Sequence, residues 1–175
     1  MMPARTPSDG PLLDQAQLRR AMGRFATGVT VVTTVGLGGK LEGVTANSFT
    51  TVSLDPPLVL WSLGRASASF ASFHDASHFA VNVLGVGQLA LSRHFSTRQL
   101  NKFAGVEHHR GLGDCPLLPG TIAHFECATE KVIEGGDHAI FIGRVLRADF
   151  RDGEPLVFTK GVYHRTVALV EEVQS

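Results

Sequence analysis

Short apolar runs rich in β-branched residues recur along the chain, separated by turns rich in glycine, proline and aspartate. Residues 28–35 are β-branched almost throughout and end in a cluster of glycines, which indicates a strand that runs into a turn. Residues 42–49 are the expected returning partner of this strand. Five later segments show the same character, namely residues 58–63, 79–84, 122–132, 140–150 and 156–159. The pattern therefore predicts about seven strands.

Helical spacing of apolar positions is confined to short segments. Asp14 is a good N-cap for a helix over residues 15–25, and residues 66–74 and 88–95 predict two further helices. Strands and helices do not alternate regularly along the chain. The order therefore favours an antiparallel barrel or sandwich carrying a few short helices over a doubly wound parallel sheet.

The length of 175 residues predicts one domain, over residues 14–175. Proline, glycine and serine near the start of the chain predict a flexible N-terminal tail over residues 1–13. Hydrophobic residues make up 43% of the chain, enough for a sizeable core. Sixteen basic residues balance sixteen acidic ones, so charge gives no reason to expect nucleic acid or an anionic membrane as a partner. The chain has two cysteines, and neither a signal peptide nor a membrane span is predicted, so we expect a cytoplasmic protein.

One short motif has the form of a dinucleotide-binding fingerprint. Residues 85–90 fit G-x-G-x-x-A, follow a predicted strand and open a predicted helix. No apolar strand follows, because residues 104–120 are rich in glycine, histidine and proline and predict a long loop. A helix-start turn that uses two glycines is therefore the favoured interpretation.

Three polar stretches are candidates for ligand binding. Residues 43–53 carry hydroxyl and amide groups at a density that suits an uncharged heterocycle or a phosphate, and a Thr/Ser-rich edge strand would look the same. Ser67 precedes a helix and suits either a helix cap or a bound anion. Lys102 beside Phe103 offers a charge and a ring to a phosphate and a heterocycle, or is an ordinary surface lysine.

His138 ends a Gly-Gly-Asp-His turn, residues 135–138, between two predicted strands. A plain hairpin turn is one interpretation, and a histidine held rigidly above a pocket is the other. Such a histidine can hydrogen-bond to a substrate or transfer a proton near neutral pH. The other histidines and the two cysteines lack the spacing of metal ligands, so no metal site is predicted.

Several ordered segments together resemble the short-chain flavin reductase family, the reductase components of two-component flavin-dependent monooxygenases. The resemblance covers residues 18–165, nearly the whole domain. It rests on FATGVTVVTT (25–34), GVTANSFTTVSLDPPLV (43–59), FAVNVL (79–84), KFAG (102–105), GDHAIFIGRV (136–145) and PLVF (155–158).

The resemblance implies a mainly β, antiparallel split barrel that binds FMN or FAD, usually as a homodimer with the flavin near the subunit interface. It also implies NAD(P)H:flavin oxidoreductase activity, with hydride transfer from NADH or NADPH to the flavin and delivery of reduced flavin to a partner oxygenase. Two alternatives stay open. One is a tight flavoprotein electron carrier that reduces a corrinoid or a ferric chelate, and the other is a non-catalytic flavin-binding module.

The same resemblance assigns site residues in three groups. The group that contacts the isoalloxazine ring and the ribityl chain is Thr45, Ala46, Asn47 and Ser48. The ribityl phosphate end is held by Ser62 and Ser67, and the site is completed by Lys102 and Phe103. The residue that contacts the nicotinamide nucleotide is His138, with Tyr163 close by. Trp61 is larger than the residue expected on its strand, which bears on pocket size and flavin preference.

Overall fold

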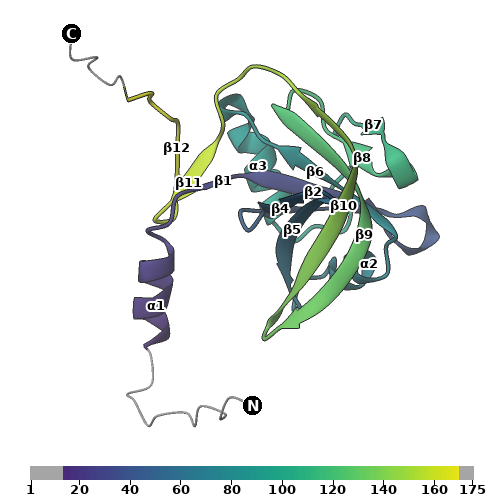
Figure 1. Cartoon of the computed structure of the whole chain (residues 1–175), viewed down its shortest axis with the longest axis horizontal. Coiled ribbons are helices and arrows are strands. Elements are labelled where there is room, and N and C mark those ends of the chain that lie inside the picture. The colour runs from purple at the N-terminus through teal and green to yellow at the C-terminus, as the bar shows by residue number, and fades with distance from the viewer. Residues whose placement is uncertain (1–13, 170–175) are drawn as a thin grey trace.

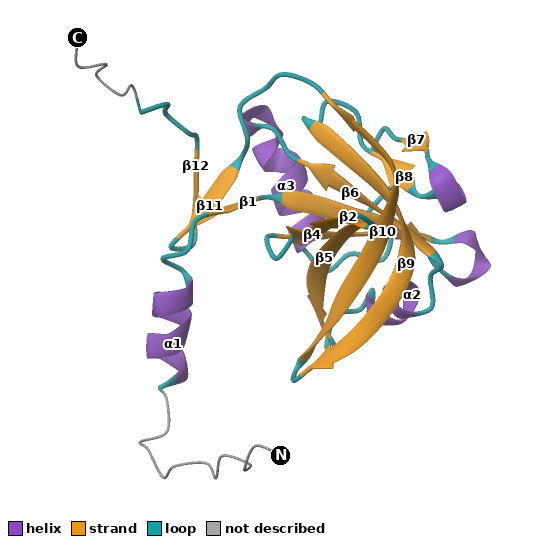
Figure 2. Ribbon diagram, viewed as in Figure 1, coloured by secondary structure: helices purple, strands orange, loops and turns teal. Residues whose placement is uncertain are grey.

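The computed structural model describes residues 14–169, so the tail predicted over residues 1–13 lies outside the described residues. Seven strands form one sheet in the order β3-β2-β6-β9-β10-β5-β4 (Figures 1 and 2). Their bounds are β2 (Thr30–Val35), β3 (Leu41–Ala46), β4 (Thr50–Leu54), β5 (Pro57–Gly64), β6 (His78–Val83), β9 (Ala123–Gly135) and β10 (His138–Phe150). Every neighbouring pair is antiparallel, which confirms the predicted antiparallel β fold and rules out a doubly wound sheet.

The sheet curls so that its two ends share one core. Val32 and Val44, near one end, belong to the same buried cluster as Val59, Trp61 and Leu63 from β5 near the other end. Within the described sheet the edge strands β3 and β4 are not paired with each other. The barrel is therefore split along this seam.

Smaller elements flank the barrel. A three-stranded sheet consists of β1 (Thr27–Gly28), β11 (Val157–Thr159) and β12 (Val162–His164), and a two-stranded one of β7 (His109–Arg110) and β8 (Pro116–Leu117). The helices are α1 (Gln15–Met22), α2 (Phe70–His74) and α3 (Leu89–Ser96). Short 3-10 turns are η1 (Leu37–Gly39), η2 (Val86–Gln88) and η3 (Leu112–Asp114). None of the helices in residues 14–169 is long and apolar enough to cross a membrane.

Several sequence predictions about elements were wrong in detail, and the first helix ends at Met22 instead of residue 25. Residues 42–49 do not form one strand, because β3 ends at Ala46 and a bend leads into the separate strand β4. Residues 66–74 are helical only from Phe70, since turns occupy the residues before it. Strand β12 was not predicted, because three residues are too short to show alternation.

Aromatic rings fill the inside of the barrel. Trp61 is fully buried and stacks on Phe141, with ring centroids 4.8 Å apart, while Phe73 meets it edge-on at 5.0 Å. Cys127 lies in the same cluster, which confirms it as a small core residue, and burial raises the pKa of its thiol to about 12. Trp61 therefore fills the core.

Helix α3 packs very closely on the outside of β3. A Cβ at Gly43 would lie 2.6 Å from Cε1 of Phe95, so only glycine fits at this crossing. Phe95 and Phe103 belong to a second buried cluster, which holds the segment after α3 against the edge strand. This close packing brings the segment 97–102 alongside the open seam of the barrel.

Candidate functional site

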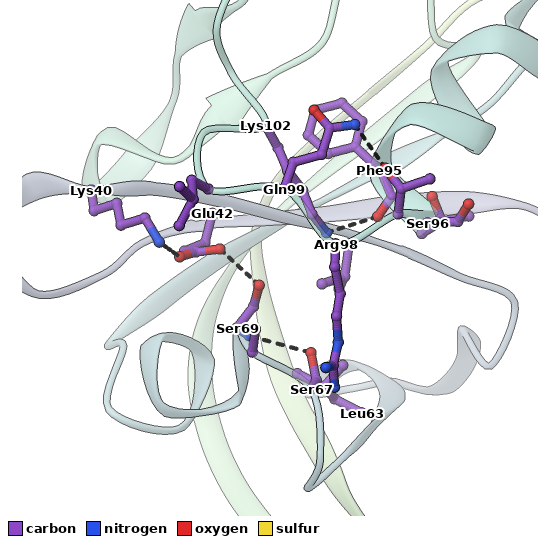
Figure 3. Close-up of a pocket in the computed structure, with 15 residues that line it drawn as sticks. Lys40, Glu42, Leu63, Ser67, Ser69, Phe95, Ser96, Arg98, Gln99 and Lys102 are labelled. Atoms are coloured by element: carbon purple, nitrogen blue, oxygen red, sulfur yellow. Dashed lines mark hydrogen bonds and ion pairs between the residues drawn. The ribbon is translucent and has the colours of Figure 1, made fainter.

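A cavity of about 520 Å³ opens where the edge of β3 faces the loop after β5 and the segment after α3 (Figure 3). Cations and hydroxyl groups share its wall with a few apolar side chains. Its polar lining residues include Lys40, Glu42, Thr45, Ser67, Ser69, Arg98 and Lys102. Such a donor set suits a phosphorylated ligand, because cationic and hydroxyl donors form strong hydrogen bonds to phosphate oxygens.

Lys102 is fixed on the cavity wall by the backbone. Its Nζ donates to the carbonyl oxygens of Gly43 and Phe95, each at 2.9 Å. Burial lowers the pKa of Lys102, and the nearby carboxylate of Glu42 opposes that shift. Since an ammonium has three donors, one N–H is left for a ligand in the cavity.

Glu42 is the buried charge of the cavity. One carboxylate oxygen pairs with Nζ of Lys40 at 2.6 Å, and the other accepts a hydrogen bond from Oγ of Ser69 at 2.7 Å. The Ser69 backbone N–H in turn donates to Oγ of Ser67 at 3.3 Å. Glu42 therefore ties the loop after β5 to β3 and neutralises Lys40, which leaves Arg98 and Lys102 as the cations for a ligand.

Arg98 bridges the two walls of the cavity. Figure 3 shows its side chain running from the segment after α3 toward Ser67 and Leu63. Its Nη2 donates to the carbonyl oxygen of Ala66 at 3.2 Å. Sequence reasoning did not single out Arg98, and only its place shortly after a helix, four residues before Lys102, could have drawn attention to it.

The predicted ring-binding residues occupy the end of β3. Thr45 lines the cavity and donates from Oγ1 to the carbonyl oxygen of Ser92 at 2.6 Å. Ala46 is buried, and its carbonyl oxygen accepts from Oγ1 of Thr30 at 2.8 Å. Asn47 is exposed at the bend that follows.

Ser48 and Ser62 form a linked pair across the seam. Oγ of Ser48 accepts from the Ser62 N–H at 2.9 Å and donates to the Ser62 carbonyl oxygen at 3.1 Å. The bend after β3 is therefore fastened to β5, directly before Leu63, which lines the cavity. Of the predicted flavin residues, Thr45, Ser67 and Lys102 line one cavity, and Ser48 and Ser62 stand beside it.

Phe103 and Tyr163 lie behind the site. Phe103 is buried against Phe95 in the second core cluster and does not line the cavity that Lys102 lines. The Tyr163 hydroxyl group hydrogen-bonds to Oγ of Ser92 at 2.9 Å, and the Ser92 carbonyl oxygen accepts from Thr45. Tyr163 thus connects the β11–β12 hairpin to the binding strand through α3.

His138 begins β10 and pairs with Gly64, the last residue of β5, where the loop after β5 starts. Its Nδ1 and Oδ1 of Asp137 are 2.7 Å apart, and this hydrogen bond lowers the pKa of Asp137. A Cβ at Gly64 would lie 3.5 Å from Nε2 of His138, so the ring lies against the start of that loop. The side chain is 51% exposed and can meet a ligand. His138 does not line the cavity itself.

The model of the flavin reductase like domain matches residues 22–166 of the chain. The chain belongs to this family. As a flavin reductase-like protein it has a donor set that fits a flavin phosphate, with Arg98, Lys102 and the hydroxyl group of Ser67 lining one cavity.

Relatives of this flavin reductase-like chain carry specific names. It is 46% identical to the FMN reductase (NADH) SmoA of Agrobacterium fabrum, over 84% of this chain and 83% of that protein. It is 38% identical to the flavin-dependent monooxygenase reductase subunit HsaB of Rhodococcus jostii, over 86% of this chain and 77% of that protein. The chain spans about half the length of two other relatives, from Rhizobium meliloti and Acinetobacter baylyi.

A solved structure agrees with the fold. The Streptomyces globisporus NADH:FAD oxidoreductase SgcE6, in complex with NAD and FAD fragments, superposes with a TM-score of 0.83 and 41% identity. The superposition covers 90% of this chain and 98% of that one. The split-barrel architecture is therefore that of known flavin reductases.

Proposed function

We propose that this chain is an NADH-dependent flavin reductase that supplies reduced FMN or FAD to a partner oxygenase. The observation that carries the proposal is the cavity in which Lys102 and Arg98 face Ser67 beside Thr45, in a chain of the flavin reductase-like family. SmoA, SgcE6 and HsaB, named for NADH-dependent flavin reduction or as a reductase subunit, support it. These names do not favour an electron carrier for corrinoids or ferric chelates.

The protein's part in this reaction is to bind and orient. When bound, a flavin would supply the ring that takes up a hydride from the reduced nicotinamide. We assign the isoalloxazine ring to Thr45, Ala46, Asn47 and Ser48, whose backbone N–H groups favour negative charge on reduced flavin. We assign the phosphate end to Ser62, Ser67 and Lys102. We add Arg98, which lines the same cavity as Ser67 and Lys102. Phe103 and Tyr163 support the site from behind.

His138→Ala tests the proposed contact with the nicotinamide nucleotide. Because the ring is half exposed beside Gly64 and has no place in the hydride step, its loss should raise the KM for NADH by about tenfold and change kcat by less than about threefold. Steady-state kinetics at saturating flavin measure both. A collapsed kcat with an unchanged KM would contradict a binding role.

The simplest test of the proposed function follows NADH absorbance in the presence of added flavin. The rate of NADH oxidation should rise with FMN or FAD concentration and saturate, as for a flavin used as substrate. A protein that stays yellow through purification and ignores added flavin would be an electron carrier instead. A protein that binds flavin without oxidising NADH would be a binding module.

Uncovered apolar surface supports a homodimer. Figure 1 shows α1 projecting away from the barrel, and in the described part of the chain it buries none of its side chains. Along β4 and β10, the side chains of Val52, Leu54, Leu146 and Phe150 are 48% to 95% exposed. Surfaces of this kind are unusual on a monomer. We therefore assign the exposed apolar side chains of β4 and β10 to contact with a second copy of the chain.

Leu54→Asp should convert the dimer to a monomer, because a carboxylate would be buried without a partner in the interface. Light scattering after size-exclusion chromatography measures the mass. The matched control is Leu37→Asp, since Leu37 is equally exposed but lies in the turn between β2 and β3. A wild-type monomer at micromolar concentration, or an unchanged dimer in Leu54→Asp, would contradict the assignment.

A cytoplasmic location fits the proposal. Both cysteines are free and buried, as expected in a reducing compartment, and NADH is an intracellular reductant.

A further inference from the structure

A second cavity adjoins the first on the outer side of β3. It has a volume of about 480 Å³ and is lined by Lys40, Leu41, Leu100, Asn101, Phe103 and His108. Lys40 and Leu100 line both cavities, so the two share a common border. A ligand whose phosphate is held by Lys102 and Arg98 can therefore extend past Lys40 into the second cavity.

The walls of the second cavity suit a flat heterocycle. Leu100 is 94% exposed, and Leu41 is partly buried and packs against the second core cluster. The His108 ring stands edge-on to Phe103, with centroids 5.3 Å apart. An aromatic ring placed here would cover apolar surface that otherwise faces water.

The polar groups of the second cavity match the edge of an adenine. Nδ1 of His108 donates to the carbonyl oxygen of Val106 at 2.9 Å, so Nε2 of the neutral ring is an acceptor, suited to an exocyclic amino group. Oδ1 of Asn101 accepts from the Phe103 N–H at 3.2 Å, which leaves the amide NH₂ to donate to a ring nitrogen. Adenine presents that combination of amino donor and ring-nitrogen acceptors.

We propose that the second cavity is an adenosine subsite, which receives the adenosine half of FAD and favours FAD over FMN through Leu100, Asn101 and His108. This rests on the proposed function, because the phosphate of the flavin must lie in the first cavity. FMN ends at its phosphate and would leave the second cavity to water. The NADH molecule carries the same adenosine chemistry, so the test separates the two sources.

Isothermal titration calorimetry of the full chain with FAD, and separately with FMN, in the absence of NADH, tests the subsite. His108→Ala and Leu100→Ser should each raise the dissociation constant for FAD about five- to tenfold and leave that for FMN within about twofold. Matched controls are His109→Ala and Leu37→Ser, which change exposed residues outside both cavities. Wild-type-like circular dichroism spectra show that the variants are folded.

The remaining outcomes overturn the assignment. Equal losses of FAD and FMN affinity, or no loss of either, would show that the second cavity does not contact adenosine. If FAD affinity holds but the KM for NADH rises with FMN as acceptor, the adenosine of NADH occupies the cavity instead. Because binding is measured without NADH, a protein that binds flavin yet fails to oxidise NADH would reject the proposed function and still test the subsite.

Discussion

Lys102→Met should raise the dissociation constant for FMN by about tenfold or more, while riboflavin binding stays within about twofold. The reason is that the ammonium is held on the cavity wall by Gly43 and Phe95 with one N–H to spare, and only FMN has a phosphate to receive it. Calorimetric titration with both flavins measures the difference. The control is Lys131→Met, which removes an exposed lysine on β9.

The comparison between the two flavins separates a phosphate contact from a structural role. If Lys102→Met weakens the binding of FMN and of riboflavin equally, the lysine only holds the segment after α3 in place, and the phosphate assignment is wrong.

The pH dependence of FMN binding gives a second check on Lys102. Burial lowers the pKa of Lys102, so its ammonium group loses its proton at a lower pH than an exposed lysine does. FMN affinity should therefore fall with rising pH over that lower pH range. In Lys102→Met this fall should vanish.

Trp61→Ala should lower the free energy of unfolding by about 3–5 kcal/mol, because it removes a fully buried ring that stacks on Phe141 and meets Phe73. Urea unfolding followed by circular dichroism measures the loss. The matched variant Trp61→Phe should lose less than half as much. It keeps an aromatic ring and removes the indole N–H, a buried donor with no hydrogen-bond partner among the described residues.

A loss below about 1 kcal/mol in Trp61→Ala would contradict the packing described for the core. Flavin affinity supplies an independent measurement, since the cavity wall is formed by Leu63 and not by Trp61. Trp61→Phe should therefore bind FMN as the wild type does. A marked gain or loss of affinity would show that the core and the site are coupled through β5.

Hydrophobic pattern was enough to predict most of the barrel, because each long strand carries β-branched or aromatic residues on a buried face. The boundary at Ala46 escaped prediction, since what ends β3 is a long-range contact, the hydrogen bonds of Ser48 to the backbone of Ser62. The short strand β12 is likewise held by its pairing with β11 and not by its own composition. Local pattern does not contain such contacts.

The site was predictable only in part. Motif resemblance identified Thr45, Ser67 and Lys102, which the fold brings to one cavity from three separate elements. Arg98 was missed because an exposed arginine after a helix has no distinctive sequence context. The size of Trp61 was expected to bear on the pocket, but alternation along β5 turns it into the core.

We expect flavin to turn over on this protein with electrons from NADH. The most direct measurement is anaerobic incubation of a trace of protein with excess NADH and excess FMN or FAD, followed by flavin absorbance. All of the added flavin should be bleached, many equivalents for each protein chain. Bleaching that stops at one equivalent of bound flavin, or no bleaching at all, would contradict it.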